Sequence, residues 1–168
     1  MATIGLLVVF PFLMAFAAAN DLLTMLIPNR ISVLLIAAFA AVAATGLLSW
    51  GEIGAHVGAG ALVLAVTFSL FAFGVIGGGD AKLAAATALW LGMDHLPDYL
   101  LIAALAGGAL TLGLLAARAQ PLPHAVARLP FALHLHDAKT GIPYGIALAA
   151  AALVVLPETL LWTRALGV

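Results

Sequence analysis

Cysteine is absent from the 168-residue chain, and charged side chains are scarce, at 8% of all residues. The absence of cysteine excludes disulfide bonds, thiolate catalysis, and zinc or iron–sulfur sites with cysteine ligands. The net charge is −1 and basic residues form no run, so the sequence indicates no nucleic acid partner. Apolar residues make up 65% of the chain. This composition is far from that of a soluble domain and predicts an integral membrane protein embedded in a lipid bilayer.

Apolar segments divide the chain into about six candidate membrane helices, each of which needs about 20 residues to cross a bilayer. We predict spans at residues 3–20, 31–50, 57–76, 81–93, 98–118 and 144–163. The fourth segment is short and glycine-flanked, and would cover only about 20 Å as a helix. It must extend into its glycine-rich flank or lie where protein or water shortens the path. The prediction is one all-α, polytopic membrane domain over residues 1–168.

The first apolar segment has some features of a signal peptide, because small residues precede Asn20 as they precede a cleavage site. However, the first five residues contain no Lys or Arg, and apolar sequence continues as far as Pro28. We therefore expect a retained first span.

The basic residues predict how the spans are oriented, because Lys and Arg collect in cytoplasmic loops. With both termini on the outer side of the membrane, only Arg164 lies outside. The cytoplasmic side then holds the remaining five: Arg30, Lys82, Arg118, Arg128 and Lys139. The proline-containing loop 119–143 lies on the same side, where we expect a lid or a short amphipathic segment.

Two aspartates, Asp21 and Asp80, lie at the cytoplasmic ends of predicted spans. A charge near hydrocarbon costs a few kcal/mol, which makes each a candidate functional residue. Two carboxylates in contact share one proton, so that one activates water while the other protonates the leaving group or the carbonyl oxygen. The glycines before Asp80 let an extended peptide approach closely. The alternative is structural: Asp80 caps a helix and Asp21 marks the membrane boundary.

Other chemistry fits the same residues less well. A phosphate-binding loop needs Lys directly after its last glycine, where this chain has Asp80, and a dinucleotide motif needs glycine at Lys82. His134 and His136 are a weak metal signal, because ligands two residues apart project differently on a helix. We expect neither a cofactor nor a metal.

Three segments carry a family resemblance in the same order along the chain. They are Asp21 followed by Ile27-Pro28-Asn29, the run from Gly77 to Lys82, and Ile142-Pro143-Tyr144-Gly145. With these segments the chain resembles the type IV prepilin peptidase family, which are membrane aspartyl proteases with a Gly-x-Gly-Asp motif. The resemblance implies an aspartic endopeptidase whose substrates are pilin-like precursors with a basic leader and a hydrophobic helix.

The resemblance also implies roles for individual residues. Asp21 and Asp80 would be the two catalytic aspartates, Gly77 and Gly79 would shape the active-site turn, and Lys82 would be the basic neighbour of the motif. Long members of the family carry a cysteine-containing zinc segment and methylate the new N-terminus. This chain has no cysteine, and is similar to the short branch associated with Flp or Tad pili, which implies leader cleavage without methyltransferase activity.

Two other functions stay open on the sequence alone. The same aspartates suit a small ion- or solute-coupled carrier, since glycine-interrupted helices near charges also occur in transporters. The charges lie toward one face and no inverted repeat is apparent, which argues against that alternative. The second is an assembly scaffold in a pilus or secretion machine.

Overall fold

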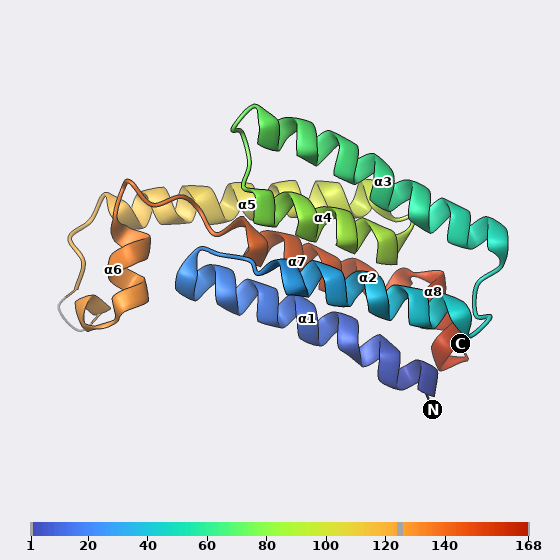
Figure 1. Cartoon of the computed structure of the whole chain (residues 1–168). Coiled ribbons are helices and arrows are strands. Elements are labelled where there is room, and N and C mark those ends of the chain that lie inside the picture. The colour runs from blue at the N-terminus through green and yellow to red at the C-terminus, as the bar shows by residue number, and fades with distance from the viewer. Residues whose placement is uncertain (1, 124–125, 168) are drawn as a thin grey trace.

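The computed structural model describes residues 2–123 and 126–167, and in these ranges all regular structure is helical, which confirms the all-α prediction. The elements are α1 (Ala2–Thr24), α2 (Asn29–Ala44), α3 (Trp50–Ala72), α4 (Gly78–Leu91), α5 (Leu96–Arg118), η1 (Val126–Arg128), α6 (Pro130–His136), α7 (Tyr144–Val155), η2 (Leu156–Glu158) and α8 (Leu160–Leu166). The long helices run alongside one another in alternating directions, and both chain ends lie at one end of the bundle (Figure 1).

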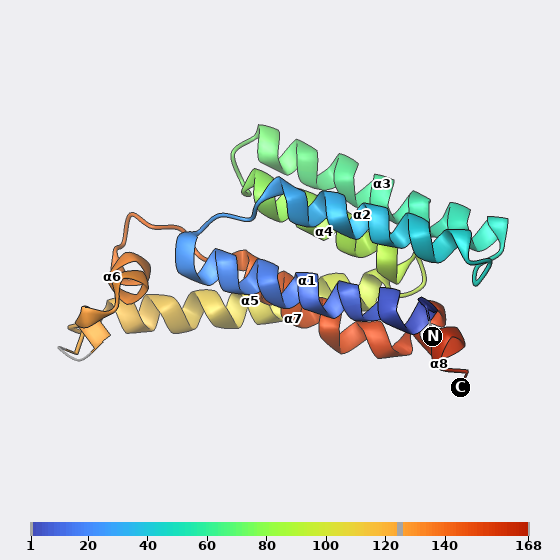
Figure 2. The same cartoon turned by 60° about the horizontal axis from the view of Figure 1, so that its bottom comes forward.

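Helix α4 is the central element and packs against α2, α3 and α7. Its sequence is rich in alanine, which lets neighbouring helices approach closely, and most of its side chains are buried. Trp90 near its C-terminal end is fully buried between the rings of Phe10 and Phe39, at centroid distances of 5.0 and 6.0 Å. The Trp90 indole donates a hydrogen bond of 2.9 Å to the carbonyl of Leu35, which ties α4 to α2. Turning the molecule shows α1 and α2 on the near side of this core (Figure 2).

The second predicted span, 31–50, is wrong at its C-terminal end. Helix α2 stops at Ala44, and the chain turns at Gly46, whose φ of 78° suits glycine. The next helix begins at Trp50 because Ser49 and Glu52 form a capping box, with the Ser49 N–H donating to Glu52 Oε2 at 2.8 Å. Helix α3 therefore starts well before the predicted residue 57 and ends at Ala72.

The last predicted span, 144–163, is broken. Helix α7 ends at Val155, a short turn contains Pro157, and α8 follows at a bend of 52°. Proline lacks the N–H that would continue the α-helix and clashes with the preceding turn, which accounts for the break.

Helix length bears on the number of membrane spans. Among the described residues, α3 and α5 are each long and apolar enough to cross a bilayer, and α7 with α8 makes a third if the bent pair counts as one span. Helix α2 is apolar but shorter, and the stretch Val8–Thr24 of α1 is apolar as well. Helix α4 extends into its glycine flank, starting at Gly78, as expected. Six spans remain a prediction.

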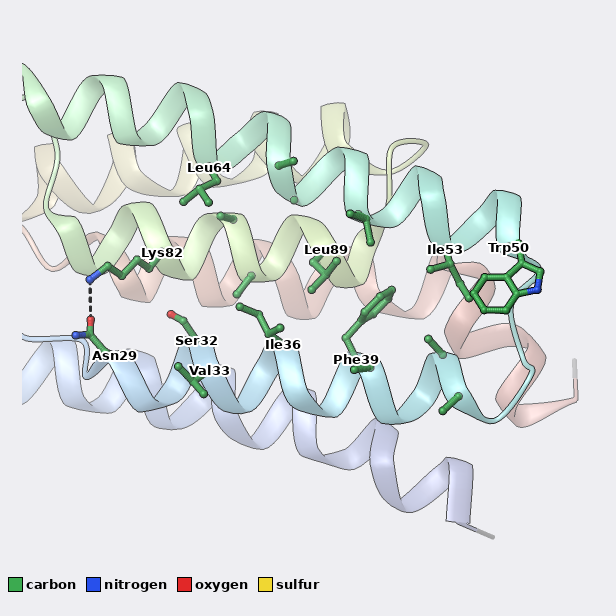
Figure 3. Close-up of a pocket in the computed structure, with 18 residues that line it drawn as sticks. Asn29, Ser32, Val33, Ile36, Phe39, Trp50, Ile53, Leu64, Lys82 and Leu89 are labelled. Atoms are coloured by element: carbon green, nitrogen blue, oxygen red, sulfur yellow. Dashed lines mark hydrogen bonds between the residues drawn. The ribbon is translucent and has the colours of Figure 1, made fainter.

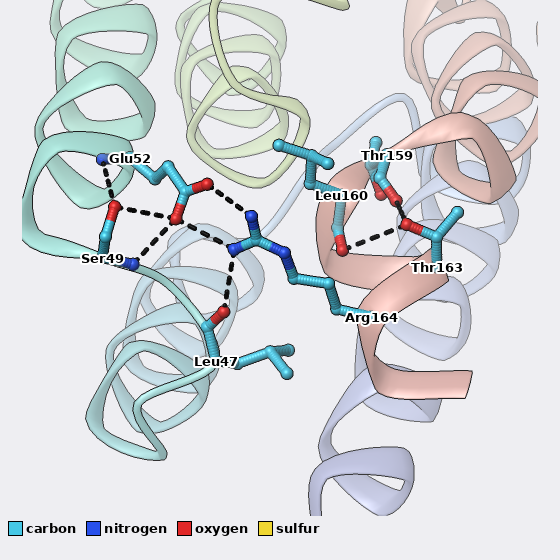
Figure 4. A network of polar contacts seen from close by, with 7 residues as sticks. All are labelled: Leu47, Ser49, Glu52, Thr159, Leu160, Thr163 and Arg164. Carbon is cyan, nitrogen blue, oxygen red and sulfur yellow. Dashed lines mark hydrogen bonds and ion pairs between the residues drawn. The ribbon is translucent and has the colours of Figure 1, made fainter. Parts of the chain in front are cut away.

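The two ends of the bundle carry different polar contacts. At the end with the chain termini, Arg164 of α8 pairs with Glu52 of α3, with Nη2 2.6 Å from Oε1 (Figure 4). At the opposite end the segment 119–143 contains η1 and α6, which lie beyond the bundle (Figure 1). Arg118 holds this segment, because its guanidinium donates to the carbonyls of Leu135, Thr140 and Gly141 at 2.8 to 3.0 Å.

Candidate active site

Three helix ends meet at the end of the bundle that faces α6, and Asp21 lies at their junction. Asp21 is in the last turn of α1 and only 5% exposed. Its Oδ2 accepts a hydrogen bond of 2.7 Å from the backbone N–H of Gly145, in the first turn of α7. A carboxylate this deeply buried needs such a partner. Asp21 is therefore fixed by a second helix and does not simply mark the end of the first.

Ile27, in the link between α1 and α2, packs between the starts of α4 and α7. A Cβ atom added at Gly145 would lie 2.8 Å from Ile27 Cδ1 and 2.8 Å from Asp21 Oδ2. A Cβ atom added at Gly79 would lie 3.1 Å from Ile27 Cβ. The two distances to Ile27 are shorter than ordinary carbon–carbon contacts. Glycine at positions 79 and 145 therefore lets the starts of α4 and α7 come this close to Ile27 without displacing it.

Asp80 is the third residue of α4, and its half-buried carboxylate lies beside the backbone of Gly77, the residue that precedes the helix. A Cβ atom added at Gly77 would lie 3.0 Å from Asp80 Oδ2. Gly79, which precedes Asp80, and Gly145, which contacts Asp21, both pack on Ile27, so Ile27 links the surroundings of the two aspartates. The structure thus brings Asp21, Asp80, Gly77 and Gly79 to the same end of the bundle, as the sequence predicts.

Lys82 points away from the helix end and toward α2. Its Nζ donates a hydrogen bond of 2.9 Å to Asn29 Oδ1, and both side chains are exposed. Within the described ranges the one ion pair closer than 4.0 Å is Glu52–Arg164, so Lys82 makes no direct ion pair with Asp80. Lys82 and Asn29 instead link α4 to α2 beside the aspartates.

Gly145 is a residue of the site for which the sequence alone predicts no role. It belongs to the segment Ile142-Pro143-Tyr144-Gly145, so its neighbourhood was marked by the family resemblance. Its contact with Asp21 joins residues 124 positions apart, and no local pattern encodes such a pairing.

The site offers two carboxyl groups, a backbone N–H donor and closely packed glycines. Such a set suits proton transfer to and from a peptide bond. Among the residues that the structure describes, no cluster of three or more His, Asp or Glu side chains has the arrangement of a metal site.

Comparisons with known proteins agree on one family. The Type IV leader peptidase family matches residues 8–112, a range that contains both aspartates. A prepilin leader peptidase/N-methyltransferase of Bacillus subtilis (strain 168) is 41% identical over 127 residues, which cover 71% of this chain and 50% of that protein. The chain therefore spans about half the length of this curated relative. No solved structure matches the chain.

Proposed function

The chain belongs to the type IV leader peptidase family, and from this premise we propose that it is an aspartic endopeptidase acting on pilin-like precursors. It removes the short basic leader that precedes their hydrophobic helix. The observation that carries the proposal is that Asp21, hydrogen-bonded to Gly145, and Asp80, which follows Gly79, lie at one end of the bundle, where Gly79 and Gly145 pack on the same Ile27. Asp21 and Asp80 are the catalytic pair.

The chemistry follows from one proton shared by two neighbouring carboxyl groups. The ionised carboxylate accepts a proton from water as the water oxygen attacks the carbonyl carbon of the scissile bond. The protonated carboxyl donates its proton to the carbonyl oxygen, which gives a tetrahedral intermediate. When the C–N bond breaks, the carboxyl group that took the water proton donates it to the departing amine, a hydroxyl of the intermediate gives its proton to the other carboxylate as the new carboxyl terminus forms, and the pair again holds one proton.

Gly145 and the active-site glycines position this pair. The N–H of Gly145 holds Asp21 Oδ2, which fixes the plane of the carboxylate and leaves Oδ1 for water. Gly77 allows a peptide backbone to approach Asp80 without meeting a side chain, and Gly79 shapes the turn by letting the start of α4 pack on Ile27. Lys82, bound to Asn29, keeps the start of α4 next to α2.

The protein acts in the cytoplasmic membrane of a bacterium, as a single domain of about six spans with the site on the cytoplasmic face and both termini outside. The alternating helix directions and the position of both termini at the end away from the aspartates support this topology (Figure 1). The chain has no cysteine, and α1 and α2 are joined by a short link, so we propose leader cleavage without methylation, as in the Flp-type branch.

Co-expression with pilin-like precursors, followed by mass spectrometry of their N-termini, tests the proposal. With the wild type we expect loss of the leader and an unmethylated new terminus. With Asp21→Asn or Asp80→Asn we expect the intact precursor. The proposal would be overturned if a folded, membrane-inserted wild type left the precursors intact. It would also be overturned if both variants cleaved them as efficiently as the wild type.

A further inference from the structure

A groove of about 950 Å³ runs along the molecule between α2 and α3, with α4 as its floor (Figure 3). It exists because α2 and α3 both pack on α4 but hardly touch each other. Small side chains line much of it, among them Ala40 and Ala43 of α2, Gly60 and Ala61 of α3, and Ala85 of α4.

The two ends of the groove differ in polarity. At one end lie Asn29, Ser32 and Lys82, and at the other lies Trp50, whose side chain is 88% exposed (Figure 3). Lys82 lies within one turn of Asp80 on α4, and Asn29 lies two residues after Ile27, which packs on Gly79, so the polar end of the groove and the candidate active site are at the same end of the bundle.

Ser32 gives a second, independent indication that the groove binds a ligand. Its Oγ is buried and finds no hydrogen-bond partner among the described residues. A buried hydroxyl without a partner is unfavourable, and most are satisfied. A polar group that enters this end of the groove would provide the partner.

The dimensions suit a helix that lies half embedded. The wall formed by α2 has 16 residues and is about 24 Å long. A helix of that length and about 10 Å in diameter occupies roughly 1,900 Å³. The groove volume of about 950 Å³ takes half of it. Small residues in the walls favour a helix over lipid chains, because they let helix backbones approach closely in membranes.

We propose that the groove binds the apolar helix that follows the scissile bond of the precursor. The N-terminal end of this helix lies at Ser32, whose hydroxyl accepts a hydrogen bond from one of the unpaired N–H groups of the first turn. The helix continues toward Trp50. This arrangement brings the scissile bond to the end of the bundle that carries Asp80, so binding along the groove positions the reacting bond. The inference rests on the proposed function, since it assigns a place to that substrate.

Photo-crosslinking tests the groove independently of catalysis. A photoreactive aliphatic analogue of similar size replaces either Ile36, which lines the groove, or Leu34, which is equally exposed on α2 and lies outside it. Both are made in the Asp80→Asn background and co-expressed with one defined precursor. An adduct with the mass of protein plus precursor at position 36 and not at 34 supports the proposal. Adducts with lipid only, with a second copy of the chain, or equally at both positions would overturn it.

Groove-filling variants give the kinetic test. We expect Ala40→Leu to lower kcat/KM for the full precursor about tenfold or more, because the larger side chain occupies the helix position. Ala41→Leu, on α2 but outside the groove, should leave it unchanged. A short peptide that spans the leader junction but lacks the apolar helix should be cleaved equally by all three proteins. Equal cleavage of the full precursor by both variants would refute the groove. If the wild type cleaves neither substrate, the proposed function fails and the cross-linking result alone decides the groove.

Ser32→Ala separates a binding role from a structural one. The hydroxyl makes no internal hydrogen bond, so its removal should leave the unfolding temperature unchanged or higher. We expect KM for the full precursor to rise about three- to tenfold, which is the loss of one hydrogen bond. A lower unfolding temperature with unchanged KM would show that Ser32 serves the fold alone and would remove it from the proposal.

Discussion

Replacing Gly145 with alanine tests the packing of the candidate active site at its tightest point. The new Cβ would lie 2.8 Å from both Asp21 Oδ2 and Ile27 Cδ1, whereas ordinary contacts begin at 3.4 Å, so each neighbour must retreat by about 0.6 Å. The hydrogen bond from the Gly145 N–H to Asp21 Oδ2, now 2.7 Å, lengthens or bends as a result.

The expected effect on cleavage exceeds the effect on stability. Overpacking costs about 1–3 kcal/mol, and the gain from replacing a helical glycine with alanine returns about 0.5–1 kcal/mol of it. A displaced reacting group has a larger effect on the cleavage rate, since a misplacement of about 1 Å lowers rates by about a hundredfold. We therefore expect Gly145→Ala to lose about ten- to a hundredfold in kcat while its free energy of unfolding falls by at most about 2.5 kcal/mol.

The assay measures leader release from a precursor by the purified protein in nanodiscs, with thermal unfolding in parallel. Gly108→Ala is the matched control, because it adds the same methyl group to α5 where nothing lies within 4 Å. This control should keep full activity. Adding Ile27→Val to Gly145→Ala removes one of the two clashing atoms and should restore part of the rate. Cleavage by Gly145→Ala within twofold of wild type would refute the reasoning.

Three further predictions concern contacts outside the aspartate pair. Arg118→Gln removes hydrogen bonds to the 119–143 segment, so limited proteolysis by trypsin within that segment should become several-fold faster; an unchanged rate would contradict this anchoring role. Glu52→Gln breaks an exposed ion pair and should lower the free energy of unfolding only slightly, with the difference shrinking at high salt and cleavage unaffected. Trp90→Phe loses the hydrogen bond to the Leu35 carbonyl and leaves a cavity, which should lower the free energy of unfolding by about 1–3 kcal/mol in chemical denaturation; no loss would mean that this buried contact contributes little.

The sequence predicts the helical class and the shared location of the aspartates, because both depend on local features. Apolar runs set where helices form, and rare charges mark where they end. The placement of Asp21 late in the first helix and Asp80 early in the fourth needs only these signals and alternating helix directions.

The errors arise where a short polar signal interrupts apolar sequence. Residues 45–49 are apolar enough to pass for helix, yet Gly46 turns the chain and Ser49 caps the next helix. The Ser49-x-x-Glu52 capping box is visible in the sequence and would have placed the start of α3 correctly. Pro157 likewise marks the break before α8.

The contacts that complete the site could not be predicted from local sequence. The bond between Gly145 and Asp21 depends on how α7 docks on α1, which is decided by packing over the whole bundle. The hydrogen bond between Lys82 and Asn29 joins residues 53 positions apart and has the same origin.

The most direct test of the aspartate pair uses purified protein in nanodiscs and a precursor of known mass. The measurement is the rate of leader release and the mass of both products for wild type, Asp21→Asn and Asp80→Asn, each checked for folding by thermal unfolding. The account predicts leader release by wild type and a loss on the order of a thousandfold or more in each folded variant. Cleavage within tenfold of wild type by either folded variant would contradict it.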